Sequence, residues 1–124
     1  METLQRKRIL VVEDEEALAE LLRIDLRRDG FEVHTESLGT TAITYAAEHP
    51  IDLVILDLKL PDINGLQVCK QLRRIYGPWM LPVVMLTALK EPIDQLKGFA
   101  HGADAYLTKP YDPKELKSAI SLLL

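Results

Sequence analysis

Hydrophobic residues follow two alternating patterns along this chain. Short runs of consecutive aliphatic residues indicate strands that are buried on both faces. Each run is followed by a longer segment in which hydrophobic residues recur every three or four positions, as on one face of a helix. The pair of patterns occurs five times, which is typical of an α/β fold in which helices cover a parallel sheet. The sequence predicts one such domain over residues 1–124.

The predicted strands are rich in valine, isoleucine and leucine and end at polar residues or turn formers. They cover residues 8–12, 31–35, 51–56, 83–86 and 105–107. The third strand is almost entirely hydrophobic, which favours a central position in the sheet. The helices should end where glycine or proline disfavours helical geometry. These breaks fall at Gly30, Pro50, the Gly77–Pro78 pair and Gly102, while Pro92 and Pro113 suit the first positions of the last two helices.

Polar side chains stand where four of the predicted strands end. Glu13 and Asp14 follow the first strand, Asp57 follows the third, Thr87 follows the fourth, and Lys109 comes shortly after the fifth. With right-handed crossovers, the carboxyl ends of parallel strands meet at one edge of the sheet, where ligands bind. We therefore expect these side chains to converge.

Crowded carboxylates need a compensating charge, because two of them about 4 Å apart repel by roughly 4 kcal/mol at an effective dielectric constant near 20. Protonation of one acid, the Lys109 ammonium or a divalent cation would each relieve this repulsion. Magnesium explains the cluster best, since it binds oxygen ligands and needs only one or two carboxylates. Asp14 and Asp57 are expected as direct ligands, and Glu13 is expected to hold a metal-bound water.

Asp57 is also the candidate nucleophile, because a carboxylate can form a covalent aspartyl phosphate. Phosphoryl transfer requires in-line positioning and positive charge on the phosphoryl oxygens. Magnesium, the Lys109 ammonium and the Thr87 hydroxyl would provide one partner for each of these oxygens.

Composition excludes several other classes of function. A formal net charge of −4 disfavours a nucleic-acid or anionic-membrane surface, and no stretch approaches the roughly 20 apolar residues of a membrane span. A cytoplasmic location is expected. The single cysteine, Cys69, allows neither an internal disulfide nor a zinc site of several thiolates. The three histidines share no motif, and Trp79 is expected to pack in the loop before the fourth strand.

In combination, the motifs resemble the receiver domain of two-component response regulators, in the CheY-like superfamily. The resemblance spans nearly the whole chain. It is carried by Asp57 and by four segments: ILVVEDE at residues 9–15, LPDING at 60–65, LTA at 86–88 and GADAYLTKP at 102–110. It implies a doubly wound, flavodoxin-like α/β fold with five helices and a five-stranded parallel sheet of strand order 2-1-3-4-5.

The resemblance also implies roles for individual residues. Asp57 would be the phosphoacceptor, and Glu13 and Asp14 would form the acidic pair of a Mg²⁺ site that the backbone carbonyl of Lys59 completes. The Lys109–Pro110 peptide bond is expected to be cis. A histidine kinase or a histidine phosphotransfer protein would donate the phosphate. The domain would catalyse its own phosphorylation and dephosphorylation without turning over an external substrate.

Signalling by such a domain would depend on Thr87 and Tyr106. In receivers the threonine moves toward the phosphoryl group, and the aromatic ring on the fifth strand rotates inward. A downstream effector would then bind the face formed by the fourth helix, the fifth strand and the last helix, including Tyr106 and Tyr111. No direct contact with nucleic acid and no membrane contact are expected from this domain.

Two departures limit the resemblance. Receivers joined to winged-helix transcription factors tend to carry a second acid after the position of Asp104 and an arginine in the last helix, which pair across a dimer. This chain has Ala105 and no arginine in residues 113–124, so the sequence does not predict a homodimer of that type, and another homodimer is neither predicted nor excluded. The apolar ending at residues 121–124 suggests a piece of a longer response regulator or hybrid kinase.

Three alternatives remain at this point. A magnesium-dependent phosphohydrolase would carry its aspartyl nucleophile in an Asp-x-Asp motif after the first strand, where this chain has Glu13-Asp14-Glu15. A nucleotide- or flavin-binding module would need a phosphate-cradling loop there, and acids would repel phosphate. A degenerate receiver would bind partners without being phosphorylated, although the intact set of acids and lysine disfavours it.

Overall fold

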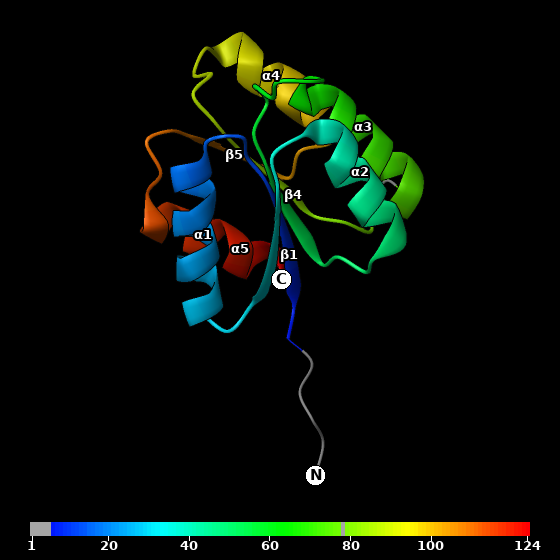
Figure 1. Ribbon diagram of the computed structural model, residues 1–124. Helices are drawn as coiled ribbons and strands as arrows, with labels where there is room; N and C mark the ends of the chain where they lie inside the picture. Colours follow the sequence, from blue (N-terminus) through cyan, green and yellow to red (C-terminus); the bar gives the residue numbers. More distant parts are fainter. Residues whose placement is uncertain (1–5, 78) are drawn as a thin grey trace.

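The computed structural model describes residues 6–77 and 79–124 and consists of a five-stranded parallel sheet flanked by helices (Figure 1). The spatial strand order is β2-β1-β3-β4-β5, as the resemblance implied. The strands are β1 (Arg8–Val12), β2 (Glu32–Glu36), β3 (Leu53–Leu56), β4 (Val83–Thr87) and β5 (Ala105–Thr108). The helices are α1 (Glu16–Arg28), α2 (Gly39–Glu48), α3 (Gly65–Tyr76), α4 (Pro92–Ala100) and α5 (Pro113–Leu123).

The predicted elements all occur, with small shifts at their ends. The third strand is shorter than expected because its pairing with β1 begins at Leu53, opposite Ile9. Asp52 lies just before the strand, and its carboxylate accepts a hydrogen bond from the N–H of Arg8, the first residue of β1, at 2.7 Å. Helix α3 ends before Gly77, which adopts a positive φ of 84°. The other half of that expected break, Pro78, lies outside the described residues, as do residues 1–5.

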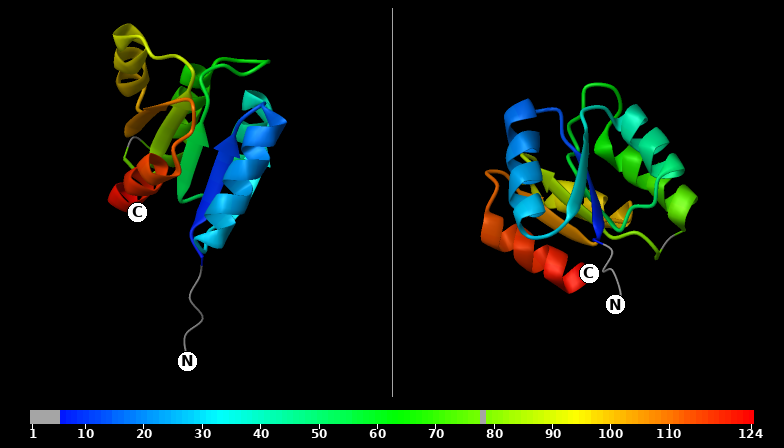
Figure 2. Two further views of the ribbon diagram at one scale, coloured as in Figure 1. Left: turned by 90° about the vertical axis from the view of Figure 1, so that its left-hand side faces the viewer. Right: turned by 60° about the horizontal axis from the view of Figure 1, so that its bottom comes forward.

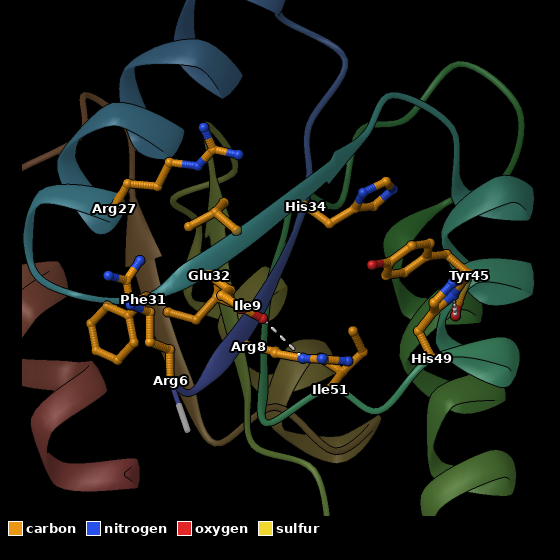
Figure 3. Close-up of a pocket in the computed structure, with 11 residues that line it drawn as sticks. Arg6, Arg8, Ile9, Arg27, Phe31, Glu32, His34, Tyr45, His49 and Ile51 are labelled. Atoms are coloured by element: carbon orange, nitrogen blue, oxygen red, sulfur yellow. Dashed lines mark hydrogen bonds and ion pairs between the residues drawn. The ribbon is translucent and has the colours of Figure 1, made fainter. Parts of the chain in front are cut away.

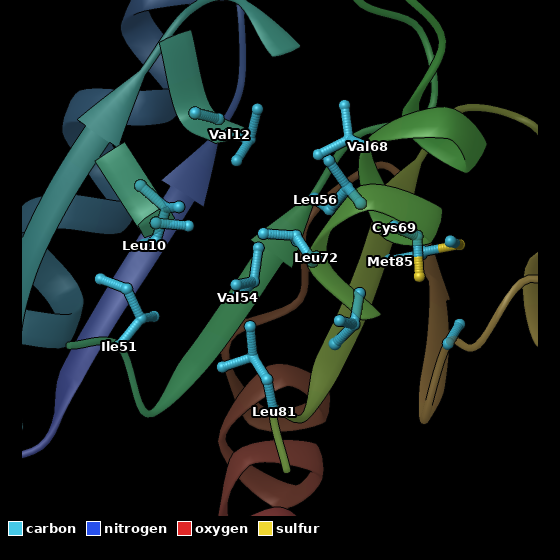
Figure 4. Close-up of a cluster of buried hydrophobic side chains, with 14 of the residues drawn as sticks. Leu10, Val12, Ile51, Val54, Leu56, Val68, Cys69, Leu72, Leu81 and Met85 are labelled. Atoms are coloured by element: carbon cyan, nitrogen blue, oxygen red, sulfur yellow. The ribbon is translucent and has the colours of Figure 1, made fainter. Parts of the chain in front are cut away.

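Alternate residues of the central strands enter two separate hydrophobic layers. Helices α1 and α5 cover one face of the sheet, and α2, α3 and α4 lie on the other (Figures 1 and 2). On β1, Ile9 and Val11 join the layer under α1 and α5, whereas Leu10 and Val12 join the layer under α2 and α3. Figure 4 shows the second layer, in which Leu72 of α3 lies among residues of the sheet. Burial on both faces explains why the predicted strands lack alternation of polar and apolar residues.

Cys69 belongs to this second layer and is fully buried, in agreement with its expected packing role. Burial raises the pKa of its thiol to about 11, so the thiol is neutral near pH 7.

Arg73 of α3 fixes the amino-terminal ends of β4 and β5. Its guanidinium donates to the carbonyl oxygens of Leu81 and Gly102 and forms an ion pair with Asp104 at 3.0 Å. The same Asp104 carboxylate accepts the N–H of Val83 at 2.8 Å. One side chain therefore connects α3 to the starts of two strands.

The expectation that Trp79 packs is wrong. Its side chain is 91% exposed, and that of the adjacent Met80 is 73% exposed. The buried position before β4 is taken by Leu81, which is 1% exposed. Because one inward-facing residue closes this end of the core, the two preceding residues stay on the surface of the turn.

Candidate functional site

Three acids that the sequence placed after strands meet at the carboxyl edge of the sheet. Carboxylate oxygens of Glu13, Asp14 and Asp57 all lie within 4.8 Å of one another. Glu13 and Asp57 are each only 4% exposed, whereas Asp14 is exposed to solvent. Strands β1 and β3 are neighbours in the sheet, so the turns that follow them bring these side chains together. The predicted convergence of the acids is confirmed.

Lys109 supplies positive charge to the two buried acids. Its Nζ lies 2.8 Å from Glu13 Oε1 and 2.9 Å from Asp57 Oδ2. Burial raises the pKa of Glu13, although the hydrogen bond from Lys109 opposes this effect. Burial lowers the pKa of Lys109, but its hydrogen bonds to Glu13 and Asp57 outweigh burial and raise that pKa. The ammonium therefore stays charged and offsets the repulsion between the carboxylates.

Backbone hydrogen bonds hold both buried carboxylates in place. Glu13 Oε2 accepts the N–H of Glu15 at 3.0 Å, and Asp57 Oδ1 accepts the N–H of Lys59 at 3.1 Å. Each carboxylate thus uses one oxygen for the local turn and the other for Lys109. This arrangement fixes the direction of the carboxylates and leaves the exposed side of the cluster to Asp14.

Helix α3 begins directly behind Asp57. A side chain at Gly65 would place its Cβ 2.4 Å from the carbonyl oxygen of Asp57, so only glycine fits this approach. The helix is capped by Asn64, whose side chain accepts the N–H of Gln67 at 3.2 Å. The local LPDING sequence therefore ends the loop after Asp57 in a fixed place.

Thr87 ends β4 beside this cluster and is fully buried. Its backbone carbonyl accepts the N–H of Lys109 at 2.8 Å. Its Oγ1 accepts the N–H of Leu89 at 3.4 Å, a long hydrogen bond. The peptide bond between Lys109 and Pro110 is cis, as expected. Thr87 and Lys109 therefore lie side by side at the ends of β4 and β5.

Leu89 links Thr87 to Tyr106, a connection that no local sequence pattern revealed. Its N–H faces the Thr87 hydroxyl, and its carbonyl oxygen accepts a hydrogen bond from the Tyr106 hydroxyl at 2.7 Å. Tyr106 is half-buried, and burial raises the pKa of its phenol. The two predicted switch residues are thus joined through one residue of the β4–α4 loop.

Tyr106 also contacts α4 directly. A Cβ added to Gly98 would lie 2.9 Å from the Tyr106 ring and 3.0 Å from the sulfur of Met85. The absence of a side chain at Gly98 allows α4 to rest on the ring. Within the predicted face of α4, β5 and α5, the Tyr106 ring therefore packs directly against α4.

Tyr111 does not share this position. Its hydroxyl donates to Asp25 Oδ2 of α1 at 2.8 Å, and its ring packs in the layer under α1 and α5. Burial and the neighbouring Asp25 carboxylate raise the pKa of this phenol. The prediction that Tyr111 belongs with Tyr106 is wrong, because the loop after Pro110 directs Tyr111 toward α1.

A hollow lies away from the acidic cluster, beside the edge strand β2, and has a volume of about 610 Å³ (Figure 3). His34, Tyr45 and His49 stack along one side, with ring centroids 3.7 Å and 4.0 Å apart. No pattern in the sequence indicated this stack. It is not a chelating arrangement, because the Tyr45 ring separates the two imidazoles.

The residues of the acidic cluster suit a hard divalent cation. All three side chains offer carboxylate oxygens, the ligand type that Mg²⁺ and Ca²⁺ prefer, and the exposed Asp14 leaves one side open for water or phosphate oxygens. No cysteine or histidine lies in the cluster. The donor set therefore fits the predicted magnesium better than zinc or copper.

The comparison with protein families decides the classification of the chain. The family described as the response regulator receiver domain matches residues 9–121. The chain belongs to this family. Its acidic cluster, Thr87 and Lys109 thus lie in a receiver domain, and the phosphohydrolase and nucleotide-binding alternatives are no longer needed.

Two curated relatives show how far the similarity extends. The receiver domain is 43% identical over 118 residues to the alkaline phosphatase synthesis transcriptional regulatory protein PhoP of Bacillus subtilis, covering 95% of this chain and 48% of that protein. It is 47% identical over 115 residues to the DNA-binding response regulator MtrA of Mycobacterium tuberculosis H37Rv, covering 93% of this chain and 49% of that protein. The chain spans about half the length of these relatives.

Solved structures agree with this classification. The response regulator TrrA of Thermotoga maritima, in complex with Mg²⁺ and BeF, is 36% identical and superposes with a TM-score of 0.85, covering 95% of this receiver domain and 99% of that chain. The chemotaxis protein CheY4 of Vibrio cholerae is 28% identical, with a TM-score of 0.90 and coverage of 97% and 100%. Among the described residues of this receiver domain, none of the helices has the length and hydrophobicity to cross a membrane.

Proposed function

We propose that this receiver domain accepts a phosphoryl group on Asp57 in a magnesium-dependent reaction. The observation that carries the proposal is the contact between Lys109 Nζ and Asp57 Oδ2 at 2.9 Å, within a cluster of three acids. A buried carboxylate beside a lysine and two further acids has the parts of an acyl-phosphate site. TrrA, a relative, was crystallised in complex with Mg²⁺ and BeF, which supports the proposed chemistry.

In the proposed reaction, one oxygen of Asp57 attacks phosphorus while the bond between phosphorus and the donor breaks. For a phosphohistidine donor, the P–N bond breaks, an O–P bond forms, and the imidazole nitrogen retains the bonding electron pair. The hydrogen bond from the Lys59 N–H to Asp57 Oδ1 orients the carboxylate. Lys109 would stabilise charge on a phosphoryl oxygen without leaving its position at the end of β5.

Glu13, Asp14, Asp57 and the backbone carbonyl of Lys59 would hold the magnesium ion. When bound, the ion supplies positive charge that offsets the carboxylates and the incoming phosphoryl oxygens. Lys109 already contacts both Glu13 and Asp57. Its charge would therefore act both on the metal-binding acids and on the phosphoacceptor. The same groups would support slow hydrolysis of the aspartyl phosphate, so the domain acts on itself and on no external substrate.

The proposed partners follow from this reaction. A histidine kinase or a histidine phosphotransfer protein would supply the phosphate in the cytoplasm. An effector would bind the face of α4, β5 and α5, where Ile93, Leu96 and Phe99 of α4 are 55%, 65% and 48% exposed. The relative MtrA is a DNA-binding response regulator. We propose that residues 1–124 form one signalling unit that controls such an effector and does not itself bind nucleic acid.

Labelling by a small phosphodonor tests the proposal. Acetyl phosphate should phosphorylate the domain only when Mg²⁺ is present, and the label should be sensitive to hydroxylamine. Peptide mapping by mass spectrometry should place the label on Asp57. A label on another residue would contradict the site assignment, and no label at all would favour the degenerate receiver.

Replacing Thr87 by Ala is expected to leave labelling of Asp57 within about threefold of wild type, because Mg²⁺ and Lys109 would still contact the phosphoryl oxygens and a neutral hydroxyl makes a weaker hydrogen bond than an ammonium. The link through Leu89 to Tyr106 would be lost. Tyr106 should then keep its unphosphorylated environment after labelling, as measured by NMR of the tyrosine ring. Thr87→Ser, which keeps the hydroxyl, is the control. Equal changes at Tyr106 in Thr87→Ala and wild type would contradict the role of Thr87.

A further inference from the structure

Asp62, in the loop after Asp57, caps the start of helix α2 from a distant part of the chain. Its Oδ1 accepts the N–H of Gly39 at 2.9 Å. Its Oδ2 accepts both the N–H of Thr40 at 2.9 Å and the Thr40 hydroxyl at 2.7 Å. Both carboxylate oxygens are therefore used by the first turn of α2.

Helix α2 depends on this contact because it has no cap of its own. Leu38 occupies the N-cap position and offers no side-chain acceptor. The first N–H groups of a helix need partners, and a nearby negative charge also interacts favourably with the helix dipole. These hydrogen bonds hold the pKa of Asp62 well below its usual range, so the carboxylate is ionised at any pH near neutrality.

An apolar contact reinforces the same junction. A Cβ at Gly39 would lie 2.6 Å from Ile63 and 2.7 Å from Val68. The glycine lets α2 approach the loop that runs from Asp57 to α3. Asp62 and Ile63 thus attach this loop to α2 by a polar and an apolar contact at adjacent positions.

The segment before α2 also contacts the turn after β1, which carries Glu13 and Asp14. The carbonyl oxygen of Glu36, at the end of β2, accepts the N–H of Glu13 at 3.0 Å. Residues 36–40 therefore connect the turn that carries Glu13 and Asp14 with the loop that begins at Asp57. We call residues 36–40 the β2–α2 bracket.

We propose that Asp62 is a positioning residue for the metal site, which acts by fastening the loop after Asp57 to the β2–α2 bracket. The inference rests on the proposed function, since it assumes that Asp57 and the Lys59 carbonyl hold magnesium. Asp62 itself is not a ligand in this proposal, because its two oxygens are already used by Gly39 and Thr40. It also stands outside the group of acids whose oxygens converge.

The test compares Asp62→Ala with Asp62→Asn. Magnesium binding is measured by NMR titration of amide resonances with MgCl₂, without any phosphodonor. Asp62→Ala should bind Mg²⁺ about fivefold more weakly, which corresponds to about 1 kcal/mol. Asp62→Asn should bind Mg²⁺ about twofold more weakly than wild type, because its single amide oxygen replaces only one of the two carboxylate acceptors and its NH₂ group accepts no hydrogen bond.

A second measurement separates positioning from general loss of stability. The Gly39 and Thr40 amides should both exchange with solvent faster in Asp62→Ala, whereas Asp62→Asn should keep the wild-type exchange rate at only one of them. Glu91→Ala is the matched control, since Glu91 belongs to the capping box of α4 and is not one of the converging acids. This control should lose helix stability without a change in magnesium affinity. At saturating Mg²⁺, the labelling rate of Asp62→Ala should return to within about twofold of wild type.

The outcomes distinguish the positioning role of Asp62 from the proposed function of the domain. Wild-type affinity in Asp62→Ala, together with fast exchange at Gly39 and Thr40, would overturn the positioning role and leave the proposed function intact. Binding as weak in Asp62→Asn as in Asp62→Ala, with one of the two amides still protected in Asp62→Asn, would show that the charge acts and not the hydrogen bonds, and would also overturn the positioning role. Absence of magnesium binding in the wild type would overturn the proposed function and this inference together.

Discussion

Replacing Asp57 by Asn is expected to abolish phosphorylation by acetyl phosphate, with a loss of at least about 10³-fold in the labelling rate. An amide lacks the nucleophilic oxygen that would form the acyl phosphate. The asparagine can still accept the N–H of Lys59, which Asp57 Oδ1 accepts now, so the loop should keep its place. The rate is measured by mass spectrometry of the intact protein over time, with Mg²⁺ present.

Asp52→Asn is the matched control for this prediction. Asp52 is an aspartate of the same sheet, but it lies at the opposite edge, where it accepts the N–H of Arg8. Labelling of Asp52→Asn should equal that of the wild type. If Asp57→Asn were labelled at the wild-type rate, the nucleophile would have to be another acid of the cluster, and the proposed mechanism would be wrong.

Replacing Lys109 by Met should have the second largest effect, because it removes the cation shared by Glu13 and Asp57. Loss of one charge-stabilising donor typically slows a reaction by about 10²- to 10³-fold, and a similar loss of labelling rate is expected. In the absence of Mg²⁺, the variant should also lose about 3 kcal/mol of unfolding free energy, since two buried carboxylates are left without their partner. Urea unfolding measures this loss.

Two conditions should reduce that stability deficit. Added Mg²⁺ would bind the folded acids and stabilise the native state. Acidification toward the raised pKa of Glu13 would protonate this group first in the folded protein, so stability rises as the pH falls through that range. Lys117→Met is the control, because Lys117 faces Asp29 at 3.5 Å with a 55% exposed side chain. A deficit that neither condition changes would contradict the electrostatic explanation.

The fold and the acidic cluster could be predicted because their signals are local. Each strand is marked by its own hydrophobic run, and the position of Asp57 after such a run places it at the ligand-binding edge. The start of β3 was predicted two residues too early, because Ile51 is buried yet precedes the first residue paired with β1. Burial and strand pairing produce the same sequence pattern, so the pattern alone could not separate them.

Contacts between distant segments explain what the sequence did not reveal. Asp62 caps a helix that begins 23 residues earlier, and no capping motif in either segment points to the other. The exposure of Trp79 depends on Leu81 filling the core, and the direction of Tyr111 depends on α1. The positions of Asp62, Trp79 and Tyr111 all depend on which distant segments lie next to them in the folded chain. Composition and periodicity do not contain this information.

The close approach of Gly98 to the Tyr106 ring has a consequence for engineering this domain. Since the ring and the helix touch without an intervening side chain, the smallest possible addition, a methyl group, would act as a wedge between them. Gly98→Ala would therefore separate α4 from Tyr106, two parts of the face that we propose an effector binds. This glycine of α4, which is not part of the acidic cluster, thus sets how closely α4 can lie against β5.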